Sequence, residues 1–112
     1  MSNNMTRVDV IQGTLDLLIL RALTLGPLHG WGISKRIREM SRDALEVNQG
    51  SRYPALRRLE DRQFVQATWG VSGEGRRAKF YSLTKHGRAK FAEERRRWQL
   101  FSVAVEHTLG AT

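Results

Sequence analysis

Side chains that can hold a DNA backbone and read base edges are concentrated in one short segment, NQGSRYPALRRLE, at residues 48–60. Arginine carries a planar fork of donors that fits phosphate oxygens and guanine, and tyrosine can hydrogen-bond a phosphate while its ring stacks on a sugar. Arginines on an exposed helix face are also common as mere solubilising groups, so the segment needs a supporting context. Its candidate DNA contacts are Asn48, Gln49, Ser51, Arg52, Tyr53, Arg57 and Arg58.

A second group of cations follows a glycine-rich loop at residues 70–75 and consists of Arg76, Arg77 and Lys79. Like charges repel one another, so a cluster of three cations at a loop end favours an anionic partner such as a DNA backbone. The alternative is a flexible surface loop with no partner.

These two groups lie on elements whose order is typical of a DNA-binding fold. Residues 64–69 and 78–83 alternate apolar and polar side chains with period two, which predicts two strands joined by a hairpin whose three glycines can take positive φ. Pro54 is tolerated in a first helical turn but costs about 3 kcal/mol or more deeper inside, so the preceding helix is predicted to begin between Asn48 and Ser51, preferably at Ser51. A helix, a strand, a basic hairpin loop and a strand are the parts of a winged helix-turn-helix.

Two further helices precede this unit. The first is predicted from about Thr14 to the turn at Gly26-Pro27, and its apolar residues cover more than half of its circumference. Because a surface helix needs only a narrow apolar stripe, we expect a second subunit to cover the excess. The second helix runs through Met40, with Ile33, Ile37 and Met40 on its inner face, and a short strand is expected near residues 45–47. His29 lies in the turn before this helix, in a structural role.

The outer face of the second helix carries Lys35, Arg36 and Arg38. These side chains either form a solvated face or include one or two phosphate contacts, for which Lys35 is the candidate.

Thr84 is expected to cap a last helix from Lys85 to about Leu109, in which aromatic and apolar residues recur every seven positions. The stripe indicates a helix that packs against another long helix, although Glu94 interrupts it and excludes a long coiled coil. Symmetric dimers are the commonest assembly, so we expect a homodimer. Trp98 is either part of that interface or one wall of an effector cavity. The candidate interface residues are Leu17, Leu20, Phe91, Trp98, Phe101, Val105 and Leu109.

Composition narrows the class of protein. The chain has 112 residues, a formal charge of +8 and no cysteine, which fits one domain with a polyanionic partner and excludes disulfide frameworks and thiol catalysis. Its three histidines have no metal-ligand spacing, and no phosphate loop, dinucleotide fingerprint or nucleophile motif is present, so neither an enzyme nor a cofactor is expected. No signal peptide or membrane-spanning run is seen, and a cytoplasmic location is expected.

Four segments in order, GTLDLLILRAL, GPLHGWGI, QGSRYPALRRLE and RRAKFYSLT, closely resemble the PadR family of bacterial transcriptional regulators in its short form with one C-terminal helix. The resemblance covers roughly Val10 to Leu109. It implies a dimeric winged helix-turn-helix whose C-terminal helix packs on the partner's first helix. It also implies repression at pseudo-palindromic promoter sites and, in many members, release by a small molecule. Tyr53 matches the family's recognition-helix tyrosine, and Arg76 and Arg77 match its basic wing.

The chain departs from the family pattern at two positions. Trp31 stands where tyrosine is commoner, and little change is expected. Arg52 stands where the family has an aliphatic residue that would complete a core stripe with Leu56 and Leu59. Because burying an unpaired guanidinium costs several kcal/mol, Arg52 is either exposed by a rotated or late-starting helix or is a functional or engineered substitution.

The expected fold is therefore mostly α with a small β-hairpin (α+β), divided into a flexible arm at residues 1–9, a DNA-binding winged helix-turn-helix at 10–84 and a dimerisation helix at 85–112. The expected function is sequence-specific binding of promoter inverted repeats. The alternative is a basic winged-helix module that binds an acidic protein, RNA or DNA without sequence preference.

Overall fold

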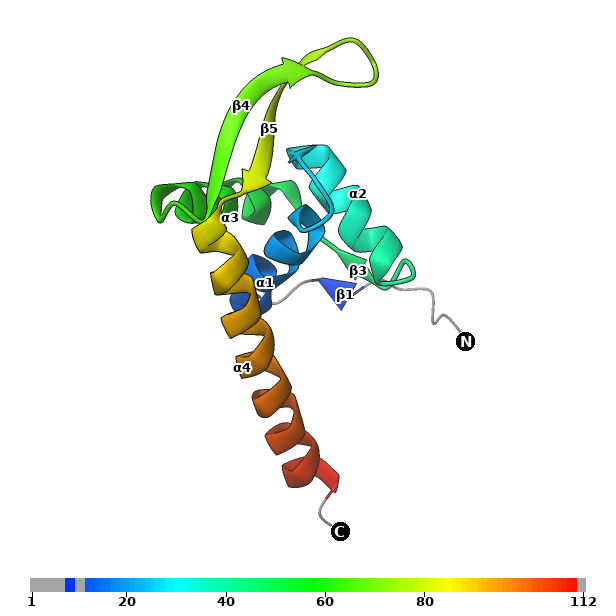
Figure 1. Ribbon diagram of the computed structural model, residues 1–112. Helices are drawn as coiled ribbons and strands as arrows, with labels where there is room; N and C mark the ends of the chain where they lie inside the picture. The colour runs from blue at the N-terminus through cyan, green and yellow to red at the C-terminus, as the bar shows by residue number, and fades with distance from the viewer. Residues whose placement is uncertain (1–7, 10–11, 111–112) are drawn as a thin grey trace, which may run out of the picture.

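The computed structural model describes residues 8–9 and 12–110. Its elements follow one another as β1 (Val8–Asp9), α1 (Gln12–Leu23), β2 (Leu28–His29), α2 (Gly30–Met40), β3 (Leu45–Glu46), α3 (Gln49–Asp61), β4 (Val65–Val71), β5 (Arg77–Leu83) and α4 (Lys85–Gly110). The fold is mostly helical with a small antiparallel sheet, as predicted (Figure 1). Most of the predicted N-terminal arm lies outside the described residues, but Val8–Asp9 pair in parallel with Leu45–Glu46.

Helix α1 forms the centre of the core. Its apolar residues pack against α2, α3, α4 and β5, and Leu15, Ile19 and Leu23 are almost completely buried. The sequence predicted Leu20 to lie in a subunit interface. This prediction is wrong, because Leu20 is 0% exposed within the chain's own core. The wide apolar surface of α1 is thus largely covered by the chain itself, and Leu17 is left half-buried.

Helix α2 follows the predicted pattern at its inner face, where Ile33 and Ile37 are buried; Met40 is exposed instead. His29 caps this helix, because its Nδ1 accepts a hydrogen bond of 3.0 Å from the Gly32 N–H. The structural role predicted for His29 is confirmed.

Helix α3 begins two residues before the preferred Ser51. Asn48 is its N-cap, and the side-chain Oδ1 of Asn48 accepts a 3.1 Å hydrogen bond from the Ser51 N–H. Pro54 therefore lies inside the helix, where it cannot donate to the carbonyl of Gly50. The cap offsets part of this loss and decides where the helix starts.

The sheet has the order β2-β5-β4, with Val65 opposite Leu83 at the base of the hairpin and Val71 opposite Arg77 at its tip. The loop closes through a 2.7 Å hydrogen bond from the Ser72 N–H to the Arg76 carbonyl. Of the three loop glycines only Gly75 has a positive φ, at 78°, whereas Gly70 belongs to β4. The hairpin projects from the body at the end opposite the tip of α4 (Figure 1).

A single residue, Thr84, joins β5 to α4 and ties both to the base of the hairpin. Its hydroxyl donates 2.7 Å to the Gln63 carbonyl, and its N–H donates 3.1 Å to the Phe64 carbonyl. The same hydroxyl accepts 2.9 Å from the Gly87 N–H and so caps α4, as predicted. From this joint α4 extends for 26 residues away from the body (Figure 1). Among the described helices, none is long and apolar enough to cross a membrane.

Candidate nucleic-acid interface

One face of α3 presents the predicted contact residues to solvent. Gln49, Tyr53 and Arg57 are spaced by four residues, which places them on the same side of the helix, and all three are exposed. Tyr53 is 56% exposed, which leaves its ring and hydroxyl available to a ligand. An amide, a phenol and a guanidinium in one row supply groups for base edges and for phosphates.

Asn48 and Ser51 lie at the start of this row and are also exposed. The Oδ1 of Asn48 is occupied as the helix cap, so its amide nitrogen is the group available to a nucleic acid. Ser51 keeps its hydroxyl at the surface. Both residues thus fit the predicted interface, with Asn48 limited to a donor.

Arg58 is placed differently from its neighbour Arg57. Its Nη2 lies 2.8 Å from Oδ1 of Asp16 on α1, and each of the two side chains is about one-third exposed (38% and 37%). Arg58, a predicted DNA contact like Arg57, is therefore ion-paired within the domain. The acidic partner on α1 turns Arg58 toward the body of the domain.

Arg52 is not on the exposed face. It is 8% exposed between α2 and α3, and its Nη1 donates a 2.8 Å hydrogen bond to the Ser34 hydroxyl of α2. Since α3 starts at Gln49, Arg52 completes the inward stripe with Leu56 and Leu59. The first alternative, a rotated or late-starting helix, is therefore wrong, and a functional or engineered substitution remains. Arg52 cannot reach a base edge from this position.

The three cations of the hairpin lie in different surroundings. Arg76 is exposed at the loop, and Arg77 is exposed with its guanidinium 4.8 Å from the Trp69 ring centroid. Lys79 is half-buried and lies 3.5 Å from the Glu60 carboxylate of α3, so it braces the hairpin against that helix. Arg76 and Arg77 remain as the cations free to meet a backbone.

Sequence reasoning missed Trp69, which is 62% exposed on β4. Its place at the end of an alternating strand, directly before the glycine-rich loop that leads to Arg76 and Arg77, was the signal that could have identified an aromatic platform on the hairpin. An exposed tryptophan beside an arginine adds stacking area to the basic edge.

The three cations of α2 also differ in their contacts. Arg38 pairs with Asp43 at 3.1 Å, and Arg36 is half-buried with a 3.5 Å hydrogen bond to the Ala22 carbonyl. Lys35 is exposed, with its Nζ 5.3 Å from the centroid of the Trp31 ring. Lys35 is therefore the α2 cation that is free for a phosphate, which agrees with its selection from the sequence.

Comparison with known proteins decides the family. The model of the transcriptional regulator PadR-like family matches residues 19–93. The chain belongs to this PadR-like family. A relative named uncharacterized protein X from Lysinibacillus sphaericus is 30% identical over 94 residues, which cover 84% of this chain and 86% of the relative.

Solved structures of transcriptional regulators have the same architecture. A transcriptional regulator from Clostridium thermocellum superposes with a TM-score of 0.77 at 26% identity, covering 86% of this chain and 93% of that one. A PadR family transcription regulator from Clostridium difficile gives a TM-score of 0.73 at 27% identity, covering 87% and 99% of the two chains. Family and relatives support a DNA-binding transcriptional regulator and indicate a regulator rather than an enzyme.

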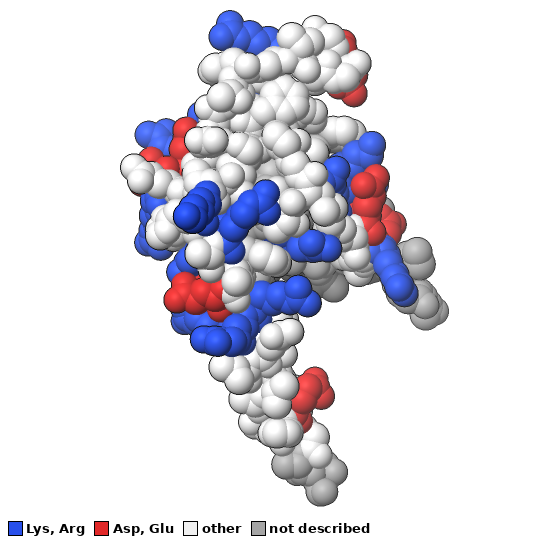
Figure 2. Space-filling view, in the orientation of Figure 1, with Lys and Arg blue, Asp and Glu red and all other residues white. Residues whose placement is uncertain are grey.

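The surface of this PadR-like protein divides by charge. Lys and Arg gather over the body and the first part of α4, whereas the distal part of α4 is mostly uncharged in the view of Figure 2. Within that distal part Trp98 is 43%, Phe101 60% and Leu109 71% exposed, and Val105 is half-buried. Phe91, nearer the body, packs against the core.

Glu94, which interrupts the apolar stripe, is held in an ionic network. It lies 3.2 Å from Lys90 and 3.3 Å from Arg97, with its side chain 25% exposed. Hydrogen bonds to Glu94 and Glu93 raise the pKa of Lys90. Among the described residues no group of three His, Asp or Glu side chains could hold a metal ion.

Proposed function

We propose that this PadR-like protein binds specific DNA sequences as a dimer. The observation that carries the proposal is the exposed row of Gln49, Tyr53 and Arg57 on α3, next to a hairpin whose Arg76 and Arg77 lack acidic partners among the described residues. In this arrangement α3 enters the major groove and the hairpin lies along the backbone as a wing. Asn48, Ser51 and Lys35 supply further contacts at the edges of the row.

The second subunit in this proposal packs on the distal part of α4. Trp98, Phe101 and Leu109 are exposed large apolar side chains on one helix, and leaving them in water is unfavourable. A twofold partner would cover them together with Val105 and the half-buried Leu17. The two copies of α3 would then lie in successive major grooves, about 34–36 Å apart, over an inverted repeat.

We further propose that the protein acts in the cytoplasm as a repressor that a small-molecule effector releases. A dimer seated on a promoter inverted repeat excludes polymerase from that site. The effector would bind one spacing of the two subunits better than the other, because a ligand with equal affinity for both shifts nothing. Trp98 and Phe101, whose ring centroids lie 6.0 Å apart, offer an aromatic wall for such a ligand at the subunit interface.

The competing function is a basic winged-helix module without sequence preference, whose partner is RNA, an acidic protein or any DNA. The net charge of +8 supports this function as well. The exposed tyrosine and glutamine of α3 favour sequence reading instead, since neither is needed for contact with phosphates alone.

Affinity selection of fragmented genomic DNA with the purified protein, near physiological salt, separates the two functions. We expect enrichment of a few inverted-repeat sites. Uniform recovery of DNA that falls steeply with salt would show a non-specific binder and would overturn the sequence-specific function. The variant Arg57→Gln removes one exposed α3 cation. It should recover fewer of the enriched sites than the wild type.

A further inference from the structure

Arg52 has a charge that the described part of the chain does not balance. Its Nε has no hydrogen-bond partner, and no carboxylate of the described residues forms an ion pair with its guanidinium. The contacts that it does make are a hydrogen bond to Ser34 and a cation–π contact of 5.4 Å with the Tyr53 ring. Buried charges in proteins are normally paired, so an unpaired arginine at 8% exposure marks a place where an anion would be stabilised.

The backbone around Arg52 leaves room for its side chain. A Cβ on Gly30 would lie 3.1 Å from the Arg52 Nε, so the absence of a side chain at position 30 admits the guanidinium. Gly30 closes off Nε, and an approaching ligand would meet the terminal nitrogens, one of which already donates to Ser34 Oγ. The guanidinium is thus held in one orientation by α2 before any ligand arrives.

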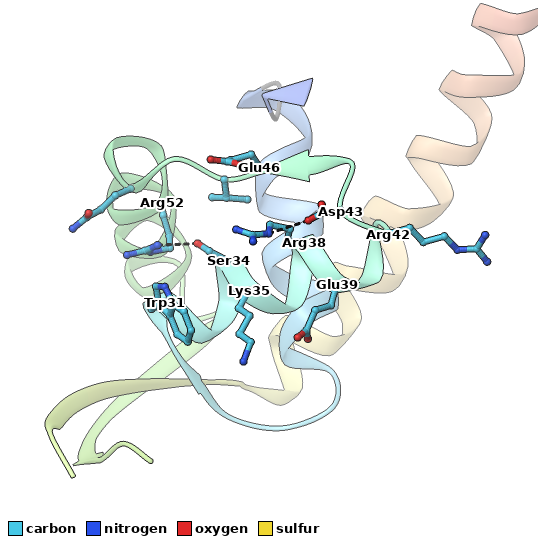
Figure 3. A pocket seen from close by; sticks show the side chains of 11 residues that line it. Trp31, Ser34, Lys35, Arg38, Glu39, Arg42, Asp43, Glu46 and Arg52 are labelled. Atoms are coloured by element: carbon cyan, nitrogen blue, oxygen red, sulfur yellow. Dashed lines mark hydrogen bonds and ion pairs between the residues drawn. The ribbon is translucent and has the colours of Figure 1, made fainter. Parts of the chain in front are cut away.

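Arg52 lines a cleft of about 620 Å³ between α2, β3 and the start of α3. Figure 3 shows Trp31, Ser34 and Arg52 gathered at one end of the cleft, and Arg42 and Asp43 at the other. Lys35 and Gln49 also belong to the lining. The carboxylates of the cleft, Glu39, Asp43 and Glu46, come from the second half of α2 and from the segment after it.

We propose that this end of the cleft is a phosphate site anchored by Arg52. The forked guanidinium fits tetrahedral oxyanions with two parallel hydrogen bonds. Lys35 adds a second cation, and the Ser34 hydroxyl and the Gln49 amide add hydrogen-bond donors. The phosphate has two sources: a phosphodiester of bound DNA, or a free phosphorylated small molecule. The first source rests on the proposed function, and the second does not.

A titration with inorganic phosphate tests the site directly. The ¹⁵N-labelled full chain is titrated with sodium phosphate at constant ionic strength, balanced with sodium chloride, and followed by NMR. Saturable shifts of the amides of Ser34, Lys35 and Gln49, together with the Arg52 Nε–H signal, support a site that takes free phosphate. Arg52→Met, which has a similar length and no charge, should abolish these shifts. Arg21→Gln removes an exposed arginine outside the cleft and should preserve them.

Stability provides an independent readout of the same site. Because Arg52→Met removes an unpaired buried charge, the free variant should melt at or above the temperature of the wild type. Phosphate should raise the melting temperature of the wild type but not of Arg52→Met, beyond the general salt effect seen for both. If Arg52→Met is unfolded, Ser34→Ala and Lys35→Met carry the test, each weakening the phosphate-dependent shift severalfold.

DNA binding separates the two sources of phosphate. If the ligand is a DNA phosphodiester, Arg52→Met lowers affinity for every duplex and reduces the slope of log K against log salt by about 1. If free phosphate shifts the NMR signals but Arg52→Met leaves DNA affinity and the salt slope unchanged, the site belongs to a phosphorylated small molecule. If neither the NMR shifts nor the change in DNA binding is observed, the proposed phosphate site is wrong. Should the wild type fail to bind DNA at all, the proposed function fails while the titration still decides the site.

Discussion

Two neighbouring arginines on α3 differ in what they contact, although nothing in their immediate sequence separates them. Arg57 is exposed on the row with Tyr53, whereas Arg58 is ion-paired with Asp16 of α1. The first has its donors free for a nucleic acid. The second uses one of its donors to fasten α3 to α1.

We therefore expect Arg57→Gln and Arg58→Gln to have different effects. Arg57→Gln should lower DNA affinity about 10-fold and leave the melting temperature unchanged, since a direct arginine contact is worth about 1–3 kcal/mol. Arg58→Gln should cost at most about 1 kcal/mol of stability, because its ion pair is partly exposed to solvent, and should affect DNA affinity less. Fluorescence anisotropy and thermal melting of both variants check this. Equal losses of affinity would show that Arg58 also faces the DNA.

The position of Arg52 could not be predicted from its neighbours in the sequence. The apolar spacing of α3 does place residue 52 inward, yet an arginine fits there because the Ser34 hydroxyl accepts a hydrogen bond from its guanidinium and Gly30 leaves space. Both partners lie on α2, so the arrangement depends on how two helices meet. Local sequence pattern predicts which side of a helix a residue lies on. It does not predict whether a residue distant in the sequence supplies a hydrogen-bond partner for a buried polar group.

The elements themselves were largely predictable, because each depends on local signals. The apolar periodicity of α1, the alternation in β4 and β5, and the capping residue Thr84 are all readable in the sequence. The start of α3 was the exception. Pro54 suggested a later start, and the cap at Asn48 prevailed.

In the proposed function the wing contacts the DNA backbone through Arg76 and Arg77. Replacing Arg76 and Arg77 together by alanine should weaken binding to all sequences alike and reduce the salt slope by about 2. Arg95→Ala with Arg96→Ala, on the exposed face of α4, is the control for an equal loss of charge. Binding isotherms at several salt concentrations measure both slopes. An unchanged slope in the wing variant would remove the hairpin from the interface.

The junction between hairpin and α4 depends on a glycine. A Cβ on Gly87 would overlap the carbonyl oxygen of Phe64, which also accepts from Thr84. Gly87→Ala should therefore destabilise the fold by about 1–3 kcal/mol or more, since the backbone of two elements has to separate.

Chemical denaturation measures this loss against Gly73→Ala, in the hairpin loop, where a Cβ meets open space and the change should stay within about 0.5 kcal/mol. Similar stabilities for the two variants would show that the junction adjusts freely.

At the scale of the whole molecule, we propose that the distal part of α4 forms the subunit interface. Phe101 is 60% exposed in the single chain, so Phe101→Glu should change its folding little but place a charge inside the proposed subunit interface. We expect a monomer by light scattering, with affinity for an inverted repeat reduced about 100-fold or more because the second half-site no longer binds intramolecularly.

Gln99→Glu adds the same charge to the same helix away from the apolar stripe, and this variant should remain dimeric. A dimeric Phe101→Glu protein would place the subunit interface elsewhere.

Thr84 gives the molecule a mechanical property. Because this one residue bonds to Gln63 and Phe64 on one side and caps α4 on the other, we expect the hairpin and the long helix to turn together. A helix of 26 residues spans about 39 Å, so moving its far end by about 3 Å rotates the helix by only about 4°. A displacement of the distal side chains of α4 would therefore change the direction of Arg76 and Arg77 only slightly. We therefore expect a molecule bound far along α4 to change the direction of the wing only slightly.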